Sequence, residues 1–217
     1  MKNIIKITAL ILSVLMLSLC AVSCAKEEER VPPKLSEIDL SKLDDISNVT
    51  ESETPTDYVI IDITDYGKIV VRLFPDVAPE TVANFKKLVS EKFYDGLIFH
   101  RVIEDFMIQG GDPEGTGMGG SDENVKGEFS ANGFENNLSH LRGVISMARS
   151  QEMDSASSQF FICQVTYPSL NGQYAAFGYV VHGIEIVDEI AAVNTNANDK
   201  PLEDVVITSI RFANVAQ

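Results

Sequence analysis

Short β-branched segments recur along this chain from Tyr58 onward, and they constrain its fold more than any other feature. Runs of valine, isoleucine and phenylalanine that are bounded by glycine, proline and polar residues are typical of β-strands. The first two runs are separated by Asp65-Tyr66-Gly67, which has the composition of a hairpin turn. The pattern predicts strands at 59–63, 68–74, 97–103, 143–148, 158–164, 177–181 and 204–210.

Two segments have the periodicity of amphipathic helices instead. The first begins near Pro79 and Glu80, because proline is tolerated in the first turn and a carboxylate suits the positive end of a helix. The second is predicted over Ile184–Ala192. Many short strands with two helices favour a closed antiparallel barrel or a sandwich. Apolar residues recur at helical spacing in the first helix at Val82, Phe85, Leu88 and Val89.

The first 23 residues have the layout of a secretory signal peptide. Lys2 and Lys6 precede an apolar run, 7–19, that is shorter than the roughly 20 residues of a spanning helix. The following Ala21-Val22-Ser23-Cys24 resembles a bacterial lipobox, which implies cleavage before Cys24 and acylation, including palmitate, at its sulfur and new amino terminus. A plain signal peptide with incidental cysteines is the alternative, and Cys20 suits a lipobox less well because the bulky Leu19 precedes it.

Residues 24–57 have the composition of a flexible, acidic tether. Residues 25–57 hold ten acidic and four basic residues, together with Pro32-Pro33 and a mixture of Ser, Thr, Glu and Pro near 50–56. Such a composition buries too little apolar surface to fold on its own. We therefore predict a signal peptide at 1–23, a lipidated tether at 24–57 and a folded domain at 58–217.

Charge and motif content exclude several classes of function. The formal net charge of −15 disfavours nucleic acid and anionic membrane surfaces as partners, so we expect membrane contact through the lipid anchor only. The glycine-rich segment 112–121 lacks the Gly-Lys-Ser/Thr of a phosphate loop, and a surface loop beside a groove is expected there. No His-Glu-x-x-His, Cys-x-x-Cys or catalytic triad is evident, so we expect no metal and no cofactor. Cys163, on a predicted strand, is expected to be a buried, inert thiol.

Arg101 is unusual because it is a charged residue within the largely apolar predicted strand 97–103. Alternation over 97–103 predicts that Arg101 shares a face with Phe99 and Ile103. A cation on an apolar strand face is costly unless it is paired or used. The acidic pair Glu104-Asp105 that follows is expected to be a solvated turn. A cation among apolar and amide side chains, with no covalent catalyst, suits binding a peptide or a reaction without a covalent intermediate.

Three sequence blocks resemble the cyclophilin-type peptidyl-prolyl isomerases. They occur in the order of that family, and the resemblance covers nearly all of residues 58–217. It implies a closed eight-stranded antiparallel β-barrel capped by two α-helices. Together with the lipobox-like segment, it indicates a bacterial lipoprotein form of the family. The blocks are Phe99–Ile103 with Phe106–Asp112, then Gly143–Ser150 with Ser155–Ile162, and finally Leu170–Gly178.

The resemblance also implies an activity, rotation about the peptide bond before proline, and roles for individual residues. Arg101 is expected to donate to the prolyl nitrogen as the bond twists, and it could also hold the carbonyl oxygen of the preceding residue. Gln109 would orient Arg101 or contact substrate, and Gln159 would line an adjoining pocket. Backbone groups of Ala148 and Arg149 would run beside the peptide, with Gly115 across the groove. The apolar pocket for the proline ring would be formed by Phe106, Met107, Phe161 and Leu170.

Three positions depart from the better-known eukaryotic members of that family. Ser169 stands where they carry a tryptophan that helps to bind cyclosporin, so we expect weak binding of that drug with activity largely kept. Tyr174 replaces a histidine at the pocket edge and keeps an aromatic wall. Arg149 replaces an asparagine of which only the backbone is needed.

Two functions of different class follow. The first is a monomeric isomerase, anchored on the extracytoplasmic side of the cell membrane, that assists the folding of exported proline-containing polypeptides. The second is a proline-peptide-binding or chaperone module whose catalysis is incidental. The presence of the whole set Arg101, Phe106, Gln109 and Phe161 favours the enzyme, because a binding module does not need the arginine.

Overall fold

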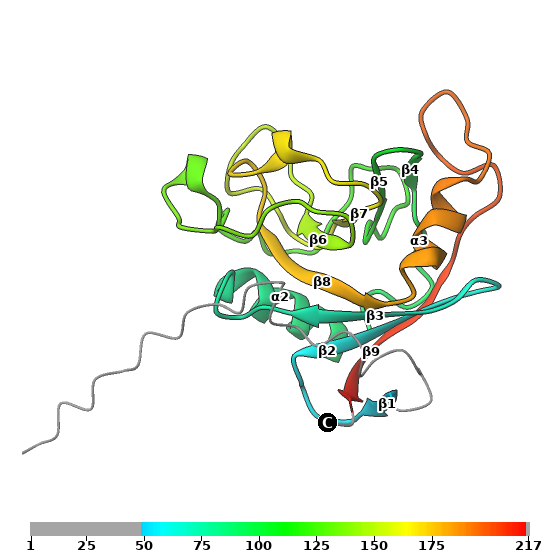
Figure 1. The fold of residues 1–217 in the computed structure, drawn as a ribbon, viewed down its shortest axis with the longest axis horizontal. Helices are drawn as coiled ribbons and strands as arrows, with labels where there is room; N and C mark the ends of the chain where they lie inside the picture. The colour runs from blue at the N-terminus through cyan, green and yellow to red at the C-terminus, as the bar shows by residue number, and fades with distance from the viewer. Residues whose placement is uncertain (1–48, 216–217) are drawn as a thin grey trace, which may run out of the picture. The chain divides into compact units, whose positions relative to one another are not determined.

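The computed structural model describes residues 49–215, and one antiparallel sheet of nine strands runs through this part of the chain (Figure 1). Two α-helices, α2 (Pro79–Ser90) and α3 (Ile184–Ala191), and two 3₁₀ turns, η4 (Ser130–Asn132) and η5 (Pro168–Leu170), accompany it. The strands are β1 (Val49–Ser52), β2 (Tyr58–Ile63), β3 (Gly67–Leu73), β4 (Arg101–Ile103), β5 (Met107–Gly110), β6 (Val144–Met147), β7 (Phe160–Cys163), β8 (Ala176–His182) and β9 (Ile207–Val215).

The sheet is not closed into a barrel. Its strands are hydrogen-bonded in the order β1-β9-β2-β3-β8-β6-β7-β5-β4, so β1 and β4 are edges. The segment before β4 does approach the segment before β9, where Ile98 and Val206 form one isolated bridge and the Phe99 N–H donates to Val205 O at 3.0 Å. Because residues 99 and 100 belong to no strand, these contacts do not extend into a ladder. The prediction of a closed, eight-stranded barrel is wrong on both counts for the described residues.

Strand β1 lies in the segment that the sequence predicts as tether. Val49 pairs with Val215 and Ser52 with Phe212 on β9. The Thr56 hydroxyl, which follows β1, donates to Ala213 O on the same strand at 2.8 Å. The folded region therefore begins before the predicted boundary at residue 58. The predicted signal peptide, Cys24 and the tether up to residue 48 lie outside the described residues. No helix within 49–215 is long and apolar enough to cross a membrane.

Both helices cover the core-facing side of the sheet, as their apolar spacing predicts. On α2 the residues Val82, Phe85, Leu88 and Val89 are all buried. The Phe85 ring, at the centre of that face, lies 5.2 Å from the ring of Phe177 and 5.8 Å from the ring of Phe160. Helix α3 contacts β3, β4 and β5, and in Figure 1 it lies well apart from α2. The largest core cluster of the described residues includes both helices, whereas Met107, Phe161 and Cys163 form a separate small cluster on β5 and β7.

A remote carboxylate caps the start of α2. The residue before the helix is Ala78, whose side chain has no acceptor for the first N–H groups. Glu128 supplies it: its Oε1 accepts from the Glu80 N–H at 3.0 Å and its Oε2 from the Thr81 N–H at 2.8 Å. Glu128 is fully buried (0% exposed), and its charge is compensated by these N–H groups at the positive end of the helix.

We predict that Glu128→Ala destabilises the fold by about 2–4 kcal/mol, because two charge-assisted hydrogen bonds are lost inside the protein. Urea denaturation followed by circular dichroism measures the change. Glu135→Ala removes an exposed carboxylate from the same segment between β5 and β6, and it should shift the urea midpoint little. Equal effects of the two substitutions would contradict the capping role of Glu128.

Candidate active site

The site is built on a row of residues that are paired directly across four strands. In the β4–β5 ladder Arg101 faces Gln109, and in the β5–β7 ladder Gln109 faces Phe161. On the other side of β7, Phe161 is paired with Ser146 of β6. Directly paired residues of neighbouring strands point to the same face of a sheet, so these four side chains lie on one face.

The two faces of these strands have different surroundings. Met107, Phe161 and Cys163 are buried together on the face that bears Arg101, and Ile103 packs against them. Phe99, by contrast, is fully buried in the main core. The prediction that Arg101 shares a face with Ile103 is confirmed, whereas the prediction for Phe99 is wrong. The reason is that regular strand structure begins only at Arg101, so alternation cannot be extended back to residue 99.

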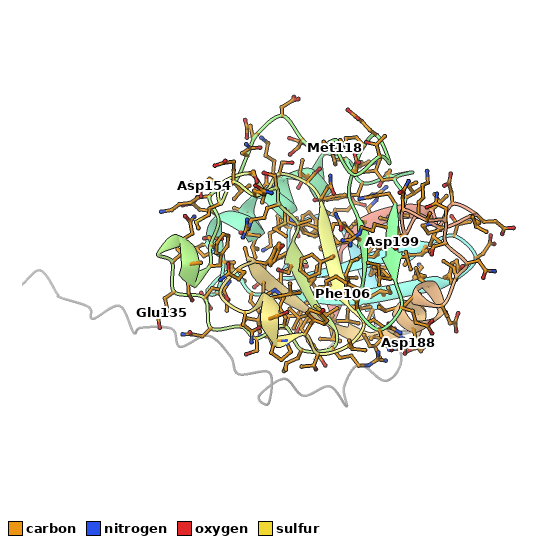
Figure 2. All side chains as sticks on the ribbon, turned by 90° about the horizontal axis from the view of Figure 1, so that it is seen from above. Phe106, Met118, Glu135, Asp154, Asp188 and Asp199 are labelled. Carbon is orange, nitrogen blue, oxygen red and sulfur yellow. The ribbon has the colours of Figure 1, made fainter. Side chains whose placement is uncertain are left out.

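A pocket of about 380 Å³ opens over this row. Phe106 and Asp199 lie near the centre of Figure 2, which looks down on this side of the molecule. Gln159 lies instead in an adjoining pocket of about 450 Å³, which shares Gln109, Gly117, Ala148 and Arg149 with the first. The structure therefore brings together ten of the site residues expected from the sequence in the first pocket: Arg101, Phe106, Met107, Gln109, Gly115, Ala148, Arg149, Phe161, Leu170 and Tyr174.

Side-chain amides connect Arg101 to the glycine-rich loop. Gln159 Nε2 donates to Gly119 O at 2.7 Å, which turns its own Oε1 toward Gln109 Nε2 at 2.8 Å. Gln109 Oε1 then faces Arg101 Nη1 at 3.5 Å. Each amide has a donor side and an acceptor side, so the first contact fixes the direction of the whole series. The series presents an acceptor to the guanidinium and holds it at the pocket rim.

The Arg101 side chain is 42% exposed. This exposure lowers the cost of removing its charge from water, although the residue lies on an apolar strand face. Its Nε also lies 3.5 Å from Asp199 Oδ2. The guanidinium is thus half in water and has an acidic neighbour, so no charge is buried without compensation. Arg101 itself lines the pocket.

The far wall of the pocket is rigid and aromatic. The rings of Phe161 and Tyr174 meet edge to face with centroids 5.8 Å apart. The Arg149 guanidinium lies 4.9 Å from the centre of the Tyr174 ring, and its Nε donates to Gln173 O at 3.0 Å. Arg149 therefore supports the wall with its side chain. The Ala148 N–H donates to Gln159 O at 2.9 Å, so Ala148 can offer a bound peptide its carbonyl but not its N–H.

Sequence reasoning missed a second loop at the pocket. Asp199 contacts Arg101 and has a left-handed backbone (φ +62°), and its carbonyl accepts from the Val102 N–H at 2.8 Å. Nothing in the sequence signals this proximity, because the loop is almost a hundred positions beyond Arg101 and has no motif. The lining residues that were not predicted are His100, Thr116, Gly117, Asn196, Asn198 and Lys200.

Beneath the pocket the reactive-looking residues are inert. Burial raises the pKa of the Cys163 thiol to about 12, which confirms the prediction of an unreactive cysteine. Burial also lowers the pKa of His140, whose Nε2 lies 3.0 Å from Ser146 Oγ and whose ring stacks on Phe161. Burial likewise lowers the pKa of His100, which is 5% exposed. His140 is thus a packing and hydrogen-bonding group, whereas neither ring nitrogen of His100 has a hydrogen-bond partner among the described residues.

The chain is similar to known proteins of one family. The family model described as "Cyclophilin type peptidyl-prolyl cis-trans isomerase/CLD" matches residues 58–212. The peptidyl-prolyl cis-trans isomerase ppi1 of Schizosaccharomyces pombe is 41% identical over 145 residues, which are 66% of this chain and 92% of that protein. A putative bifunctional phosphatase/peptidyl-prolyl cis-trans isomerase of Streptococcus pyogenes is 42% identical over 68% of this chain, but only 37% of that longer protein is spanned.

Among solved structures, a cyclophilin type peptidyl-prolyl cis-trans isomerase of Cryptosporidium parvum has 31% sequence identity and a TM-score of 0.68. The match covers 74% of this chain and 99% of that one. The present chain therefore belongs to the cyclophilin-type peptidyl-prolyl cis-trans isomerases. It is an enzyme that isomerises the peptide bond before proline, and its substrates are proline-containing peptides.

The buried histidines predict how stability depends on pH. The native pKa values of His100 and His140 lie below that of an unfolded histidine, about 6.5. As the pH falls below about 6.5 the unfolded chain binds protons first, so stability decreases. Asp95, Asp112 and Asp188 have lowered pKa values as well, and they lose their contributions only at lower pH, below about 4.

The urea midpoint should therefore decrease as the pH is lowered from about 7 to about 5. The substitution His140→Asn should reduce that decrease, because the asparagine side chain does not bind a proton. A midpoint that is constant over this range would contradict the buried neutral state of both histidines.

Proposed function

We propose that Arg101 supplies the catalytic interaction of this isomerase. The barrier to rotation, about 18–20 kcal/mol, comes from delocalisation of the nitrogen lone pair into the carbonyl group. When the bond twists, this delocalisation is lost and the prolyl nitrogen becomes a hydrogen-bond acceptor. A guanidinium N–H that donates to this nitrogen stabilises the twisted state more than either planar state, which is the requirement for catalysis.

The observation that carries this proposal is the placement of Arg101 at the rim of an apolar pocket. Met107 and Phe161 form the buried floor of that pocket, next to Phe106 and Leu170. In our proposal the floor receives the proline ring, which has no polar group to satisfy. The amide series through Gln109 keeps the guanidinium directed toward the bond that lies above the floor.

The remaining groups of the groove would hold the peptide on either side of proline. We assign the Ala148 carbonyl and the Arg149 backbone to one edge, Gly115 to the opposite edge and Tyr174 to the end wall. Gln159 would face the residue that enters the adjoining pocket. None of these groups needs to ionise or to form a covalent bond during the reaction.

We further propose that the enzyme acts on exported polypeptides while anchored by lipid at Cys24 on the extracytoplasmic side of a membrane. Support comes from the sequence: a basic and apolar amino-terminal segment, the lipobox-like Ala21-Val22-Ser23-Cys24, and an acidic spacer before the folded region. Such a spacer would hold a monomeric domain away from the bilayer, where it meets chains as they emerge and fold. Slow isomerisation before proline limits such folding.

Arg101→Ala tests the catalytic role. We expect kcat/KM for a proline tetrapeptide to fall by about 10²–10³-fold, because the donor to the twisted state is removed. A protease-coupled isomerisation assay measures this loss. Arg72→Ala, which removes an arginine that packs over Tyr58 and Phe74 outside the pocket, should leave kcat/KM unchanged. Full turnover of the Arg101 variant would show that the proposed catalytic role of Arg101 is wrong.

Cys24→Ala tests the anchor. Expressed with its full sequence in a bacterium, the wild-type chain should carry acyl chains by mass spectrometry and sediment with membranes. The variant should lose the acyl mass and be released, since stable anchoring needs the lipid. Cys20→Ala is the matched control, because Leu19 makes residue 20 a poor lipidation site. Unchanged membrane retention of Cys24→Ala would refute the proposed anchor.

A further inference from the structure

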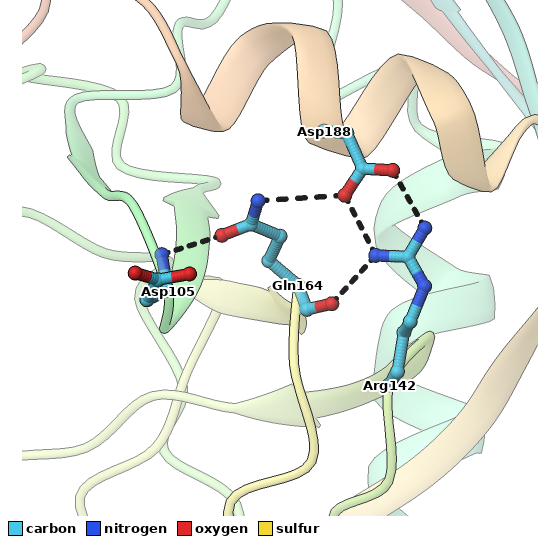
Figure 3. A network of polar contacts seen from close by, with 4 residues as sticks. All are labelled: Asp105, Arg142, Gln164 and Asp188. Carbon is cyan, nitrogen blue, oxygen red and sulfur yellow. Dashed lines mark hydrogen bonds and ion pairs between the residues drawn. The ribbon is translucent and has the colours of Figure 1, made fainter.

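Outside the pocket, four residues form a polar network that ends at the pocket wall (Figure 3). Asp105 belongs to the β4–β5 turn, Arg142 precedes β6, Gln164 follows β7, and Asp188 lies on α3. None of the four lines the pocket. The network nevertheless connects helix α3 to the turn that carries Phe106.

Gln164 holds the β4–β5 turn at two points. Its side-chain Oε1 accepts from the Asp105 N–H at 2.7 Å, and its backbone N–H donates to Phe106 O at 2.9 Å. Asp105 has a left-handed backbone (φ +60°), a conformation that is unfavourable for most residues other than glycine. The hydrogen bond to Gln164 stabilises the turn in this conformation.

Arg142 and Asp188 in turn fix Gln164. The guanidinium of Arg142 binds both Asp188 oxygens at 2.6 Å, and its Nη1 also donates to Gln164 O at 2.7 Å. The Gln164 Nε2 lies 3.4 Å from Asp188 Oδ1, which directs its Oε1 toward the turn. The hydrogen bond from Arg142 lowers the pKa of Asp188, so the pair stays ionised at neutral pH.

This network affects the position of Phe106 more than it affects the stability of the fold. The side chains of Arg142 and Asp188 are 41% and 42% exposed, and exposed ion pairs contribute little to stability. Phe106, however, lines the pocket, and its ring lies 4.5 Å from that of Tyr167. Arg101 is placed separately, by the β4–β5 ladder and by Asp199 and Gln109.

We propose that Gln164, Arg142 and Asp188 are positioning residues that set the Phe106 wall for the proline ring, without taking part in the bond rotation. This inference rests on the proposed role of Phe106 in the pocket. Loss of the network lets the turn relax, which weakens substrate binding. The step assisted by Arg101 is unaffected.

The chain contains a matched ion pair that lacks this connection. Asp95 binds Arg211 of β9 through two contacts of 2.7 and 2.6 Å, as Asp188 binds Arg142. Both side chains are also partly exposed, and neither residue lines the pocket or contacts the β4–β5 turn. The substitution Asp95→Ala therefore removes the same kind of ion pair, but one that does not position Phe106.

The experiment compares Gln164→Leu, Asp188→Ala and Asp95→Ala in the isomerisation assay, with KM and kcat determined separately for one proline tetrapeptide. We expect KM to rise by about two- to tenfold in the Gln164 and Asp188 variants, from the loss of a hydrogen bond, with kcat within about twofold of wild type. Asp95→Ala should show an unchanged KM. Urea denaturation reports the stability of all three variants.

The double variant Gln164→Leu/Asp188→Ala should have the KM of Gln164→Leu alone, because the two residues act in series. An additive rise in KM, an equal rise in Asp95→Ala, or a fall in kcat with KM unchanged would each overturn the proposal. Failure of the proposed catalytic role is distinguishable, because it appears as full turnover of Arg101→Ala whatever the KM of these variants.

Discussion

The register of β5 is the constraint on which the site depends. This strand pairs with β4 on one side and with β7 on the other, so it alone sets Gln109 between Arg101 and Phe161. A slip of one residue would turn Gln109 into the core and Ile108 into the pocket. Burial of Ile108 in the core makes such a slip costly.

Glycines fix the end of β5 in this register. A Cβ on Gly110 would lie 3.2 Å from Ile98 O, and one on Gly111 would lie only 2.5 Å from Ser158 O. Gly111 also has a positive φ of 86°, which side chains rarely adopt. Asp112 then accepts the N–H groups of Glu114, at 2.8 Å, and of Thr116, at 3.0 Å, which shapes the loop across the groove. The short segment 107–112 thus contributes to three parts of the site. Met107 belongs to the apolar floor, Gln109 to the amide series, and Asp112 shapes the loop at the opposite rim.

The site separates apolar binding from polar positioning. The proline ring requires only an apolar floor, whereas the donor must have a defined direction. The structure meets the second requirement through side-chain amides and ion pairs that lie at the rim, where Arg101 keeps contact with water. Because no group must change its protonation state, the neutral histidines and the thiol beneath the pocket can serve packing alone.

Most of the elements follow from local patterns in the sequence, whereas most of the pocket was expected from the resemblance to a family. Runs of apolar and β-branched residues predict every described strand except β1 and β5, and helical spacing predicts α2 and α3. The ordered family motifs bring Phe161 and Leu170 to Arg101. Tertiary structure alone decided the rest. Edge pairing made β1 from residues of a tether-like composition, and an irregular segment before Arg101 left the sheet open. The cap Glu128, the loop at Asp199 and the support from Gln164 are contacts between distant segments, whose energies depend on a geometry that no local pattern records.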